Sequence, residues 1–459
     1  MTSSVDTPPR PQGQRDYTTG SLRQNIWLLA VPMVLEMGLV SLFRLADMFW
    51  VGKLGPEALA AITIGENVRW ALSGMAMGQG IGGLAVVARR IGEGDESAAN
   101  HATLQSVLLA LGIAALVSFI GFTFAEPMLL LLGTQPEVVP QGLVFLHVTF
   151  AGLTGFLMVP IINSLLRGAG EARLALIVRV LSFGLGLVVE PVLIFGWGPL
   201  PALGVAGAAL ALVGSQWLGF VVQMVILVSG RARIRIDLRH LCVDLPLMWQ
   251  IFRIALPSTI QMTLRSFSRA TLLGVVALYG TFAVAAYGVA TRVLMTAFVP
   301  GFGLGNAAAT LVGQNLGAEK PDRAEQSAWI IASYNLAFML ACAVVFVLFA
   351  EPIVAAFNDT PAVVALGAQA LRIFSVGYVF SAVGVVMARA FDGAGNTVPA
   401  MVINLFTLWG LQIPLAWLLS QVLGWGATGL WLGISAANVA NGVIFVIWFR
   451  RGRWKHREV

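Results

Sequence analysis

Three ionisable residues lie inside one long apolar stretch near the start of the chain. Glu36, Arg44 and Asp47 interrupt a hydrophobic run, 28–55, that is long enough to cross a bilayer. A charge at membrane depth is costly, and such residues usually face a protein interior or a water-filled cavity. Glu36 and Asp47 are eleven residues apart, so they lie about 20° apart on a helix, and Arg44 can reach Asp47. We expect one ionisable stripe, with Glu36 and Arg44 lining a cavity or a gate.

A second intramembrane carboxylate follows in the same half of the chain. Glu190 lies in an apolar segment and precedes Pro191. Because proline has no N–H to donate to the carbonyl of Leu187, a polar backbone group is exposed one turn before Glu190. Glu66 and Arg69 are one turn apart in another segment, and we expect them to form a local ion pair. Glu190 is therefore a candidate functional residue together with the first stripe.

Deep basic residues distinguish the second half of the chain. Arg265, Arg292 and Arg372 lie inside predicted spans, and the last belongs to span 362–391. We expect only bases, and no acids, within the spans of this half. The three arginines either line a cavity or bind backbone carbonyls between helices, and the sequence leaves both possibilities open. Arg179 lies near a span end, so we expect its side chain to extend into the aqueous phase.

The composition excludes most soluble functions. The 459 residues are 58% hydrophobic and 11% charged, whereas soluble domains are about a quarter charged. Arginines in the loops explain the net charge of +6, so we expect no nucleic-acid partner. The sequence has no P-loop, and its four histidines and two cysteines lack metal-ligand spacing. We therefore expect a membrane protein without enzymatic activity, cofactor or metal site.

Twelve apolar segments predict an all-α integral membrane protein with twelve transmembrane helices. Most basic loop residues fall on one side of the membrane together with both chain ends. This pattern predicts a multi-pass protein of the plasma or inner cell membrane with both termini in the cytoplasm. The predicted parts are a tail (1–23), an N-terminal six-helix lobe (24–229), a linker (230–248), a C-terminal six-helix lobe (249–449) and a second tail (450–459).

An internal repeat relates the two halves of the chain. One constant shift in residue number maps Pro32 onto Pro257, Arg44 onto Arg269, and the Gly-Ala-Gly sequence at 168–170 onto that at 393–395. Because each half contains an even number of spans, both halves insert in the same orientation. We expect a pseudo-two-fold axis along the membrane normal, with a cleft between two lobes that alternate in access.

The motifs VPMVLEMGLVSLFRLADMFWVGKLG, LLRGAGEARLA and VVEPVLIFGWG resemble the multidrug and toxic compound extrusion (MATE) family. The resemblance covers essentially the whole chain. It implies secondary active efflux of amphipathic small molecules, driven by the inward flow of protons or sodium ions through a transporter in the lipid bilayer. We expect a monomer, because a two-lobe transporter needs no oligomeric pore.

Two branches of that family hold the coupling ion in different lobes. In the NorM-like pattern, two C-terminal-lobe carboxylates fall on Arg265 and Ser381 of this sequence, so that cation site is lost. In the DinF-like pattern, an N-terminal-lobe aspartate matches Asp47. A second carboxylate falls on Glu190, while Gly186 replaces the asparagine of the pattern. The resemblance therefore favours the DinF-like branch, with Asp47 and Glu190 as the ion-coupling residues.

Three functions remain open on the sequence. The first is a cation-coupled antiporter that exports drugs or toxic metabolites. The second, suggested by the arginines of the C-terminal half, is a flippase or exporter of an anionic or zwitterionic amphiphile. The third is an intramembrane lipid-modifying enzyme, which would require a nucleophile or a metal site at membrane depth.

Overall fold

The computed structural model describes residues 15–131, 137–237 and 242–457, which are mostly helical. Residues 1–14 and 458–459 of the predicted tails and 238–241 of the predicted linker lie outside the described residues. The first half contains α1 (Leu22–Val51), α2 (Pro56–Glu93), α3 (Glu96–Thr123), α4 (Ala125–Leu131), α5 (Val139–Ala151), α6 (Leu153–Gly168), α7 (Ala172–Phe195) and α8 (Gly204–Val228). The second half contains α9 (Leu245–Ala277), α10 (Thr281–Gly317), α11 (Pro321–Leu348), α12 (Ala350–Ala355), α13 (Pro361–Gly393), α14 (Thr397–Leu405), α15 (Ile413–Trp417) and α16 (Gly426–Arg450). The prediction of an all-α fold is confirmed.

The long helices account for the predicted membrane spans. Within the described residues, ten helical segments are long and apolar enough to cross a membrane, and α5 with α6 form an eleventh span that is bent by 51°. At the bend, a Cβ on Gly152 would lie 2.1 Å from a methyl group of Val213, so only glycine fits there. The helix α9 has 33 residues, which is long enough for the twelfth predicted span, although Arg253, Arg265 and Arg269 make it less apolar than the other eleven.

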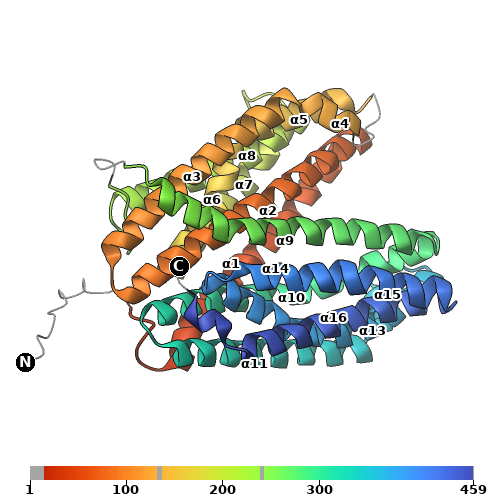
Figure 1. Ribbon diagram of the computed structural model, residues 1–459. Coiled ribbons are helices and arrows are strands. Elements are labelled where there is room, and N and C mark those ends of the chain that lie inside the picture. Colours follow the sequence, from red (N-terminus) through yellow and green to blue (C-terminus); the bar gives the residue numbers. More distant parts are fainter. Residues whose placement is uncertain (1–14, 132–136, 238–241, 458–459) are drawn as a thin grey trace, which may run out of the picture.

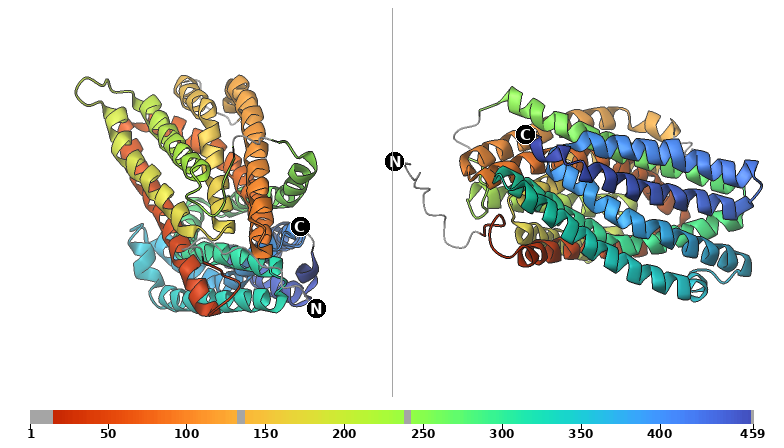
Figure 2. Two further views of the ribbon diagram at one scale, coloured as in Figure 1. Left: turned by 90° about the vertical axis from the view of Figure 1, so that its left-hand side faces the viewer. Right: turned by 60° about the horizontal axis from the view of Figure 1, so that its bottom comes forward.

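The helices form two lobes, α1–α8 and α9–α16. Figure 1 shows the two groups of helices inclined to one another, and Figure 2 shows the same arrangement from two other sides. The lobes meet where α1 and α2 pack against α9 and α10. They approach each other at the end where α1 begins and α16 ends, and diverge towards the other end (Figure 1). We call these the closed end and the open end.

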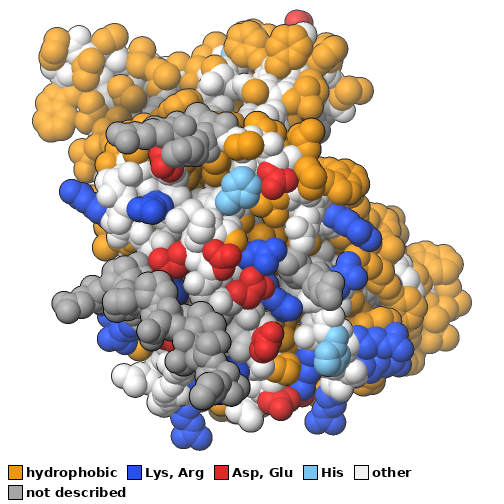
Figure 3. All heavy atoms as spheres, turned by 60° about the vertical axis from the view of Figure 1, so that its left-hand side comes forward, with side chains coloured by type: hydrophobic (Ala, Val, Ile, Leu, Met, Phe, Trp, Pro, Cys, Tyr) orange, Lys and Arg blue, Asp and Glu red, His pale blue; other side chains and the backbone are white. Residues whose placement is uncertain are grey.

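Charged side chains gather at the closed end. Figure 3 shows basic and acidic residues over this face, while hydrophobic side chains cover the flanks. A protein surrounded by lipid has apolar flanks and polar ends, because charges remain in contact with water. The surface therefore has the distribution of a multi-pass membrane protein.

Glycines allow the lobes to touch at the closed end. A Cβ on Gly92 of α2 would lie 2.0 Å from the carbonyl oxygen of Gln314 of α10. One on Gly317 of α10 would lie 2.1 Å from the carbonyl oxygen of Arg89 of α2. Because both contacts are with backbone atoms, no side-chain rotation could relieve the clash that a larger residue would cause.

The N-terminal segment 15–21 binds both lobes at the closed end. The hydroxyl group of Tyr17 donates to the carbonyl oxygen of Gly170, between α6 and α7, at 3.3 Å. On the other side, Nζ of Lys320, between α10 and α11, donates to the carbonyl oxygen of Thr18 at 3.0 Å. The segment therefore strengthens the contact between the lobes.

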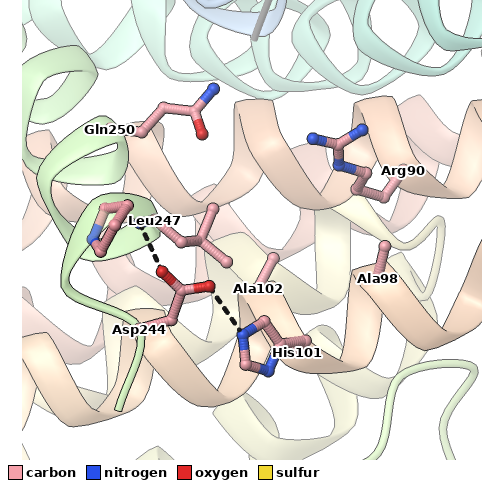
Figure 4. A pocket seen from close by; sticks show the side chains of 8 residues that line it. Arg90, Ala98, His101, Ala102, Asp244, Leu247 and Gln250 are labelled. Carbon is pink, nitrogen blue, oxygen red and sulfur yellow. Dashed lines mark hydrogen bonds and ion pairs between the residues drawn. The ribbon is translucent and has the colours of Figure 1, made fainter.

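The predicted linker borders a cavity of about 360 Å³ between α2, α3 and the start of α9 (Figure 4). Asp244 Oδ1 accepts a hydrogen bond from the backbone N–H of Leu247 at 3.0 Å, and Oδ2 lies 3.1 Å from His101 Nε2. The Leu247 amide first, and then the His101 ring, hold the pKa of Asp244 below its usual value of 3.8. Because Asp244 caps the helix, α9 begins at Leu245 and not at the predicted position 249.

Candidate functional site

Asp47 and Glu190 come together inside the N-terminal lobe. Asp47 belongs to α1 and Glu190 to α7, and these helices pack against each other. Glu190 is 2% exposed, and Asp47 is the neighbouring ionisable group that acts on it most strongly. Among the described residues, neither carboxylate oxygen of Glu190 has a hydrogen bond of good geometry. The site therefore consists of two neighbouring acids, one of them buried and unsatisfied.

An ion pair on α2 faces the same acids. Glu66 and Arg69 bind each other, as expected from their spacing. Both also act electrostatically on Glu190, so this pair belongs to the site, which the sequence alone did not indicate. With Asp47, the described side chains of this site are three acids and one base. When all four are ionised, these side chains carry excess negative charge, which favours the binding of a cation.

Glu36 is enclosed near the closed end and is 0% exposed. Its carboxylate lies 3.3 Å from Arg167 Nη1 and 3.5 Å from Arg179 Nε, and it accepts a hydrogen bond from Asn163 Nδ2 at 3.2 Å. The prediction that Arg179 extends into water is wrong, because Glu36 supplies a counter-charge inside the lobe. We call these four residues the Glu36 cluster. Its enclosure does not fit the expectation that Glu36 lines a cavity.

The Glu36 cluster is adjacent to the contact between the lobes. The hydroxyl group of Thr310 on α10 donates to the backbone carbonyl of Arg167 at 3.0 Å. Gln314 Nε2, one turn further along α10, donates to the carbonyl of Gly168 at 2.8 Å. The end of α6 therefore contacts the buried Glu36 through the side chain of Arg167, and the C-terminal lobe through its backbone carbonyl groups.

The C-terminal lobe contains a buried acid. Asp392 is 4% exposed and forms an ion pair with Arg389 at 3.2 Å. The prediction that the spans of this half carry only bases is therefore wrong. The cause is a helix boundary, because α13 continues to Gly393, beyond the predicted end at 391. By the constant shift of the internal repeat, Asp392 corresponds to Arg167. This reversal of charge between equivalent positions was the signal that could have revealed the buried acid.

Arg265 and Arg269 lie one turn apart on α9. Arg265 is half-buried, and its Nη2 donates to Oδ1 of Asn404 at 3.4 Å. Arg269 is exposed, and its Nη2 lies 3.7 Å from Sδ of Met295 on α10. Neither arginine forms an ion pair with a carboxylate in the described part of the chain.

The other predicted residues have different surroundings. Arg292 on α10 is exposed, and the structure shows no bond from its guanidinium to any described residue. Arg372, by contrast, binds Glu351 at 3.1 Å and the carbonyl of Val347 at 3.3 Å. The guanidinium of Arg372 is therefore bound to an acid and to a backbone carbonyl. The side chain of Arg44 lies outside the described residues.

Comparison with known proteins matches the chain to one family over both halves. The family model described as MatE matches residues 32–192 and 257–418. These two matches begin at Pro32 and Pro257, the two prolines that the predicted repeat places in register.

Relatives and a solved structure agree with this match along nearly the whole chain. The probable multidrug resistance protein NorM of Thermotoga maritima is 25% identical over 446 residues, covering 95% of this chain and 94% of that protein. An FAD transporter of Shewanella oneidensis is 28% identical, covering 90% of this chain and 91% of its own. A multidrug resistance MATE family transporter solved in an outward-facing conformation superposes with a TM-score of 0.90, 26% identity and coverage of 97% and 98%. The chain therefore belongs to the MatE family of multi-pass membrane transporters.

Proposed function

We propose that this protein is a secondary active antiporter that exports amphipathic small molecules in exchange for protons or sodium ions. The coupling ion binds at Asp47 and Glu190 in the N-terminal lobe. Membership of a transporter family supports transport over the lipid-modifying enzyme that the sequence left open. The relative named a probable multidrug resistance protein supports export of small molecules.

The burial of Glu190 carries this proposal. An ionised carboxylate without hydrogen-bond partners is unstable in a poorly hydrated site, and a second acid beside it makes ionisation of both still more costly. The pair is therefore stabilised when it takes up a proton or a cation, and the two groups titrate as a unit. By the internal repeat, Asp47 corresponds to Leu272 and Glu190 to Leu415, so the C-terminal lobe has no equivalent acid pair.

Cation binding at this pair changes the charge inside the N-terminal lobe. Neutralisation removes the repulsion between α1 and α7 at Asp47 and Glu190. Both helices contain a proline, Pro32 and Pro191, where a backbone carbonyl lacks its usual partner and bending is less costly. On this proposal the loaded lobe repacks and substrate is released on the outside. Release of the ion on the inside restores the first arrangement.

The position of the acid pair favours the DinF-like branch of the family, because Arg265 occupies the place of the NorM-like C-terminal carboxylate. We propose that the closed end and both termini face the cytoplasm, since basic loops accumulate there. The conformation is then outward-facing, which is supported by its similarity to the solved outward-facing transporter. One chain with two lobes is the transporting unit.

Export of an anionic amphiphile is the second candidate function. The C-terminal lobe carries Arg265, Arg269 and Arg292 without carboxylate partners in the described residues. A relative named as an FAD transporter adds support, because FAD carries a diphosphate. This candidate differs from the first in the charge of the substrate and shares its coupling site.

Transport measurements in proteoliposomes test the coupling site. We expect Asp47→Asn and Glu190→Gln each to abolish gradient-driven export of fluorescent amphipathic dyes, while Glu190→Asp retains part of it. Proton and sodium gradients are applied separately, and substrate-induced proton release is measured in the purified protein. Glu93→Gln is the matched control, because Glu93 is an exposed acid paired with Arg90 on the surface. Unchanged coupling in both neutral variants would refute the assignment.

A further inference from the structure

Two exposed arginines in the C-terminal lobe lack acidic partners at membrane depth. Among the described residues, the guanidinium of Arg269 contacts the sulfur of Met295 at 3.7 Å, and that of Arg292 has no bond. Met295 and Arg292 are three residues apart on α10, so they lie on neighbouring positions of that helix. The two arginines therefore lie near each other, one on α9 and one on α10.

The direction of Arg292 follows from the part of α10 that touches the other lobe. Near the middle of α10, a Cβ on Gly303 would lie 2.6 Å from Cα of Val34 on α1, so this face of α10 packs against the N-terminal lobe. Arg292 precedes Gly303 by eleven residues, which places it about 20° from the same face. Gly303 is buried and Arg292 is exposed. Arg292 therefore points between the lobes where they have diverged.

The direction of Arg269 follows from the part of α9 that touches α2. Met262 packs against Gly74 of α2 in the N-terminal lobe, where an added Cβ would lie 3.4 Å from Cβ of Met262. Arg269 follows Met262 by seven residues, about 20° around the helix. Arg269 is exposed, so it also faces the space between the lobes.

Two exposed apolar residues of the N-terminal lobe lie close to the helix faces that turn towards the C-terminal lobe. Trp70 lies one turn from Gly74 on α2, and Met48 lies about 40° from the face of α1 that carries Val34. Trp70 is 50% exposed and Met48 is 57% exposed. The space between the lobes is thus bordered by basic groups on one side and by apolar groups on the other.

We propose that Arg269 and Arg292 bind the anionic group of the transported substrate while its apolar body rests on Trp70 and Met48. The substrate class is then an amphiphile with a carboxylate, sulfate or phosphate group. This inference rests on the proposed transport function and specifies its substrate. Exposed guanidinium groups without internal counter-ions are available to such anions and bind them through charge-assisted hydrogen bonds, which can be bidentate.

Two probes with the same body and opposite charge test this assignment. 1-Pyrenebutyrate and 4-(1-pyrenyl)butyltrimethylammonium are titrated into the protein in nanodiscs, with empty nanodiscs as blanks. We expect the wild type to bind the anion at least about tenfold more tightly, and Arg269→Gln with Arg292→Gln to remove this preference. Charge-retaining lysine variants at both positions keep it. Trp70→Ala should weaken the binding of both probes to the same extent.

Arg253→Gln and Arg372→Gln are the controls. Arg253 is an exposed arginine on α9, about 24 Å from Arg269 along the helix, and Arg372 is bound to Glu351. Both variants should keep the preference for the anion. A wild-type preference for the cation, or equal weakening of both probes in the glutamine variants, would overturn the proposal. Loss of the preference in the lysine variants would do the same.

The transport assay separates this inference from the coupling site. If Asp47→Asn and Glu190→Gln abolish gradient-driven export but the wild type prefers the cationic probe, only the substrate assignment fails. If the anion preference holds but neither variant affects gradient-driven export, only the coupling assignment fails.

Discussion

The hydroxyl group of Thr310 donates a hydrogen bond to the backbone carbonyl of Arg167, 3.0 Å away, and so joins the two lobes at the closed end. The side chain of the same arginine binds the buried Glu36 at 3.3 Å. Parting the lobes breaks a bond to the residue that neutralises the buried charge of the N-terminal lobe. We therefore expect residues at this contact to determine the balance between the two conformations.

Enlarging one glycine at the closed end should prevent closure. A Cβ on Gly317 would lie 2.1 Å from a backbone oxygen of α2, so Gly317→Val should hold the closed end apart and lower transport by about tenfold or more. Spin labels on α3 and α11, in a background without Cys242 and Cys342, measure the separation. We expect longer distances in the variant than in the wild type.

Gly288→Val is the matched control on the same helix. A Cβ on Gly288 meets no atom within 4 Å, so this variant should keep both the wild-type distances and transport. If Gly317→Val gave the wild-type distances at the closed end, the glycine contacts would not control closure.

The cap on α9 predicts a pH dependence at the linker. The pKa of Asp244 is lowered in the folded protein. The carboxylate therefore contributes its full stabilisation at pH values above 3.8, the usual pKa of the group. This contribution disappears as the pH falls through the lowered pKa. Hydrogen exchange at the Leu247 amide should be protected at neutral pH and lose protection only in that acidic range. Asp244→Ala, which removes the capping oxygen, should accelerate exchange at pH 7 by roughly three- to tenfold.

The cap of α3, Asp95, provides the comparison for this measurement. Asp95 caps α3 by accepting from the Ala98 amide at 2.8 Å, without a histidine among its described partners. His101→Asn should therefore affect exchange at Leu247 and leave exchange at Ala98 unchanged. Equal effects at both amides would show that His101 does not act through Asp244.

Hydrophobic patterning and the repeat predicted the helices, because the spans are long and apolar. They did not predict which spans are neighbours, and the pairing of Asp47 with Glu190 came from the resemblance to the MATE family. In the structure α1 packs against α7, the two helices that carry these carboxylates. This part of the site could therefore be predicted from the motifs that carry the resemblance.

Pairing between distant charges could not be predicted in this way. Arg179 on α7 binds Glu36 on α1, and Arg372 on α13 binds Glu351 on α12. Hydropathy and spacing locate a charge along a span, but the partner depends on how helices rotate against one another. Asp392 was missed for a different reason, because it lies one residue beyond the predicted end of its span.

The Glu36 cluster predicts an asymmetric response to loss of its charges. Glu36→Gln leaves Arg167 and Arg179 buried without a counter-ion, which should lower the free energy of unfolding by about 3–5 kcal/mol. Adding Arg179→Gln removes one of the two uncompensated charges, so the double variant should recover part of this loss. Thermal and chemical unfolding in detergent measure both effects. Glu93→Gln, which affects a surface pair with Arg90, should change stability by less than about 1 kcal/mol. If the double variant were less stable than Glu36→Gln alone, Arg179 would have a structural role beyond neutralising Glu36.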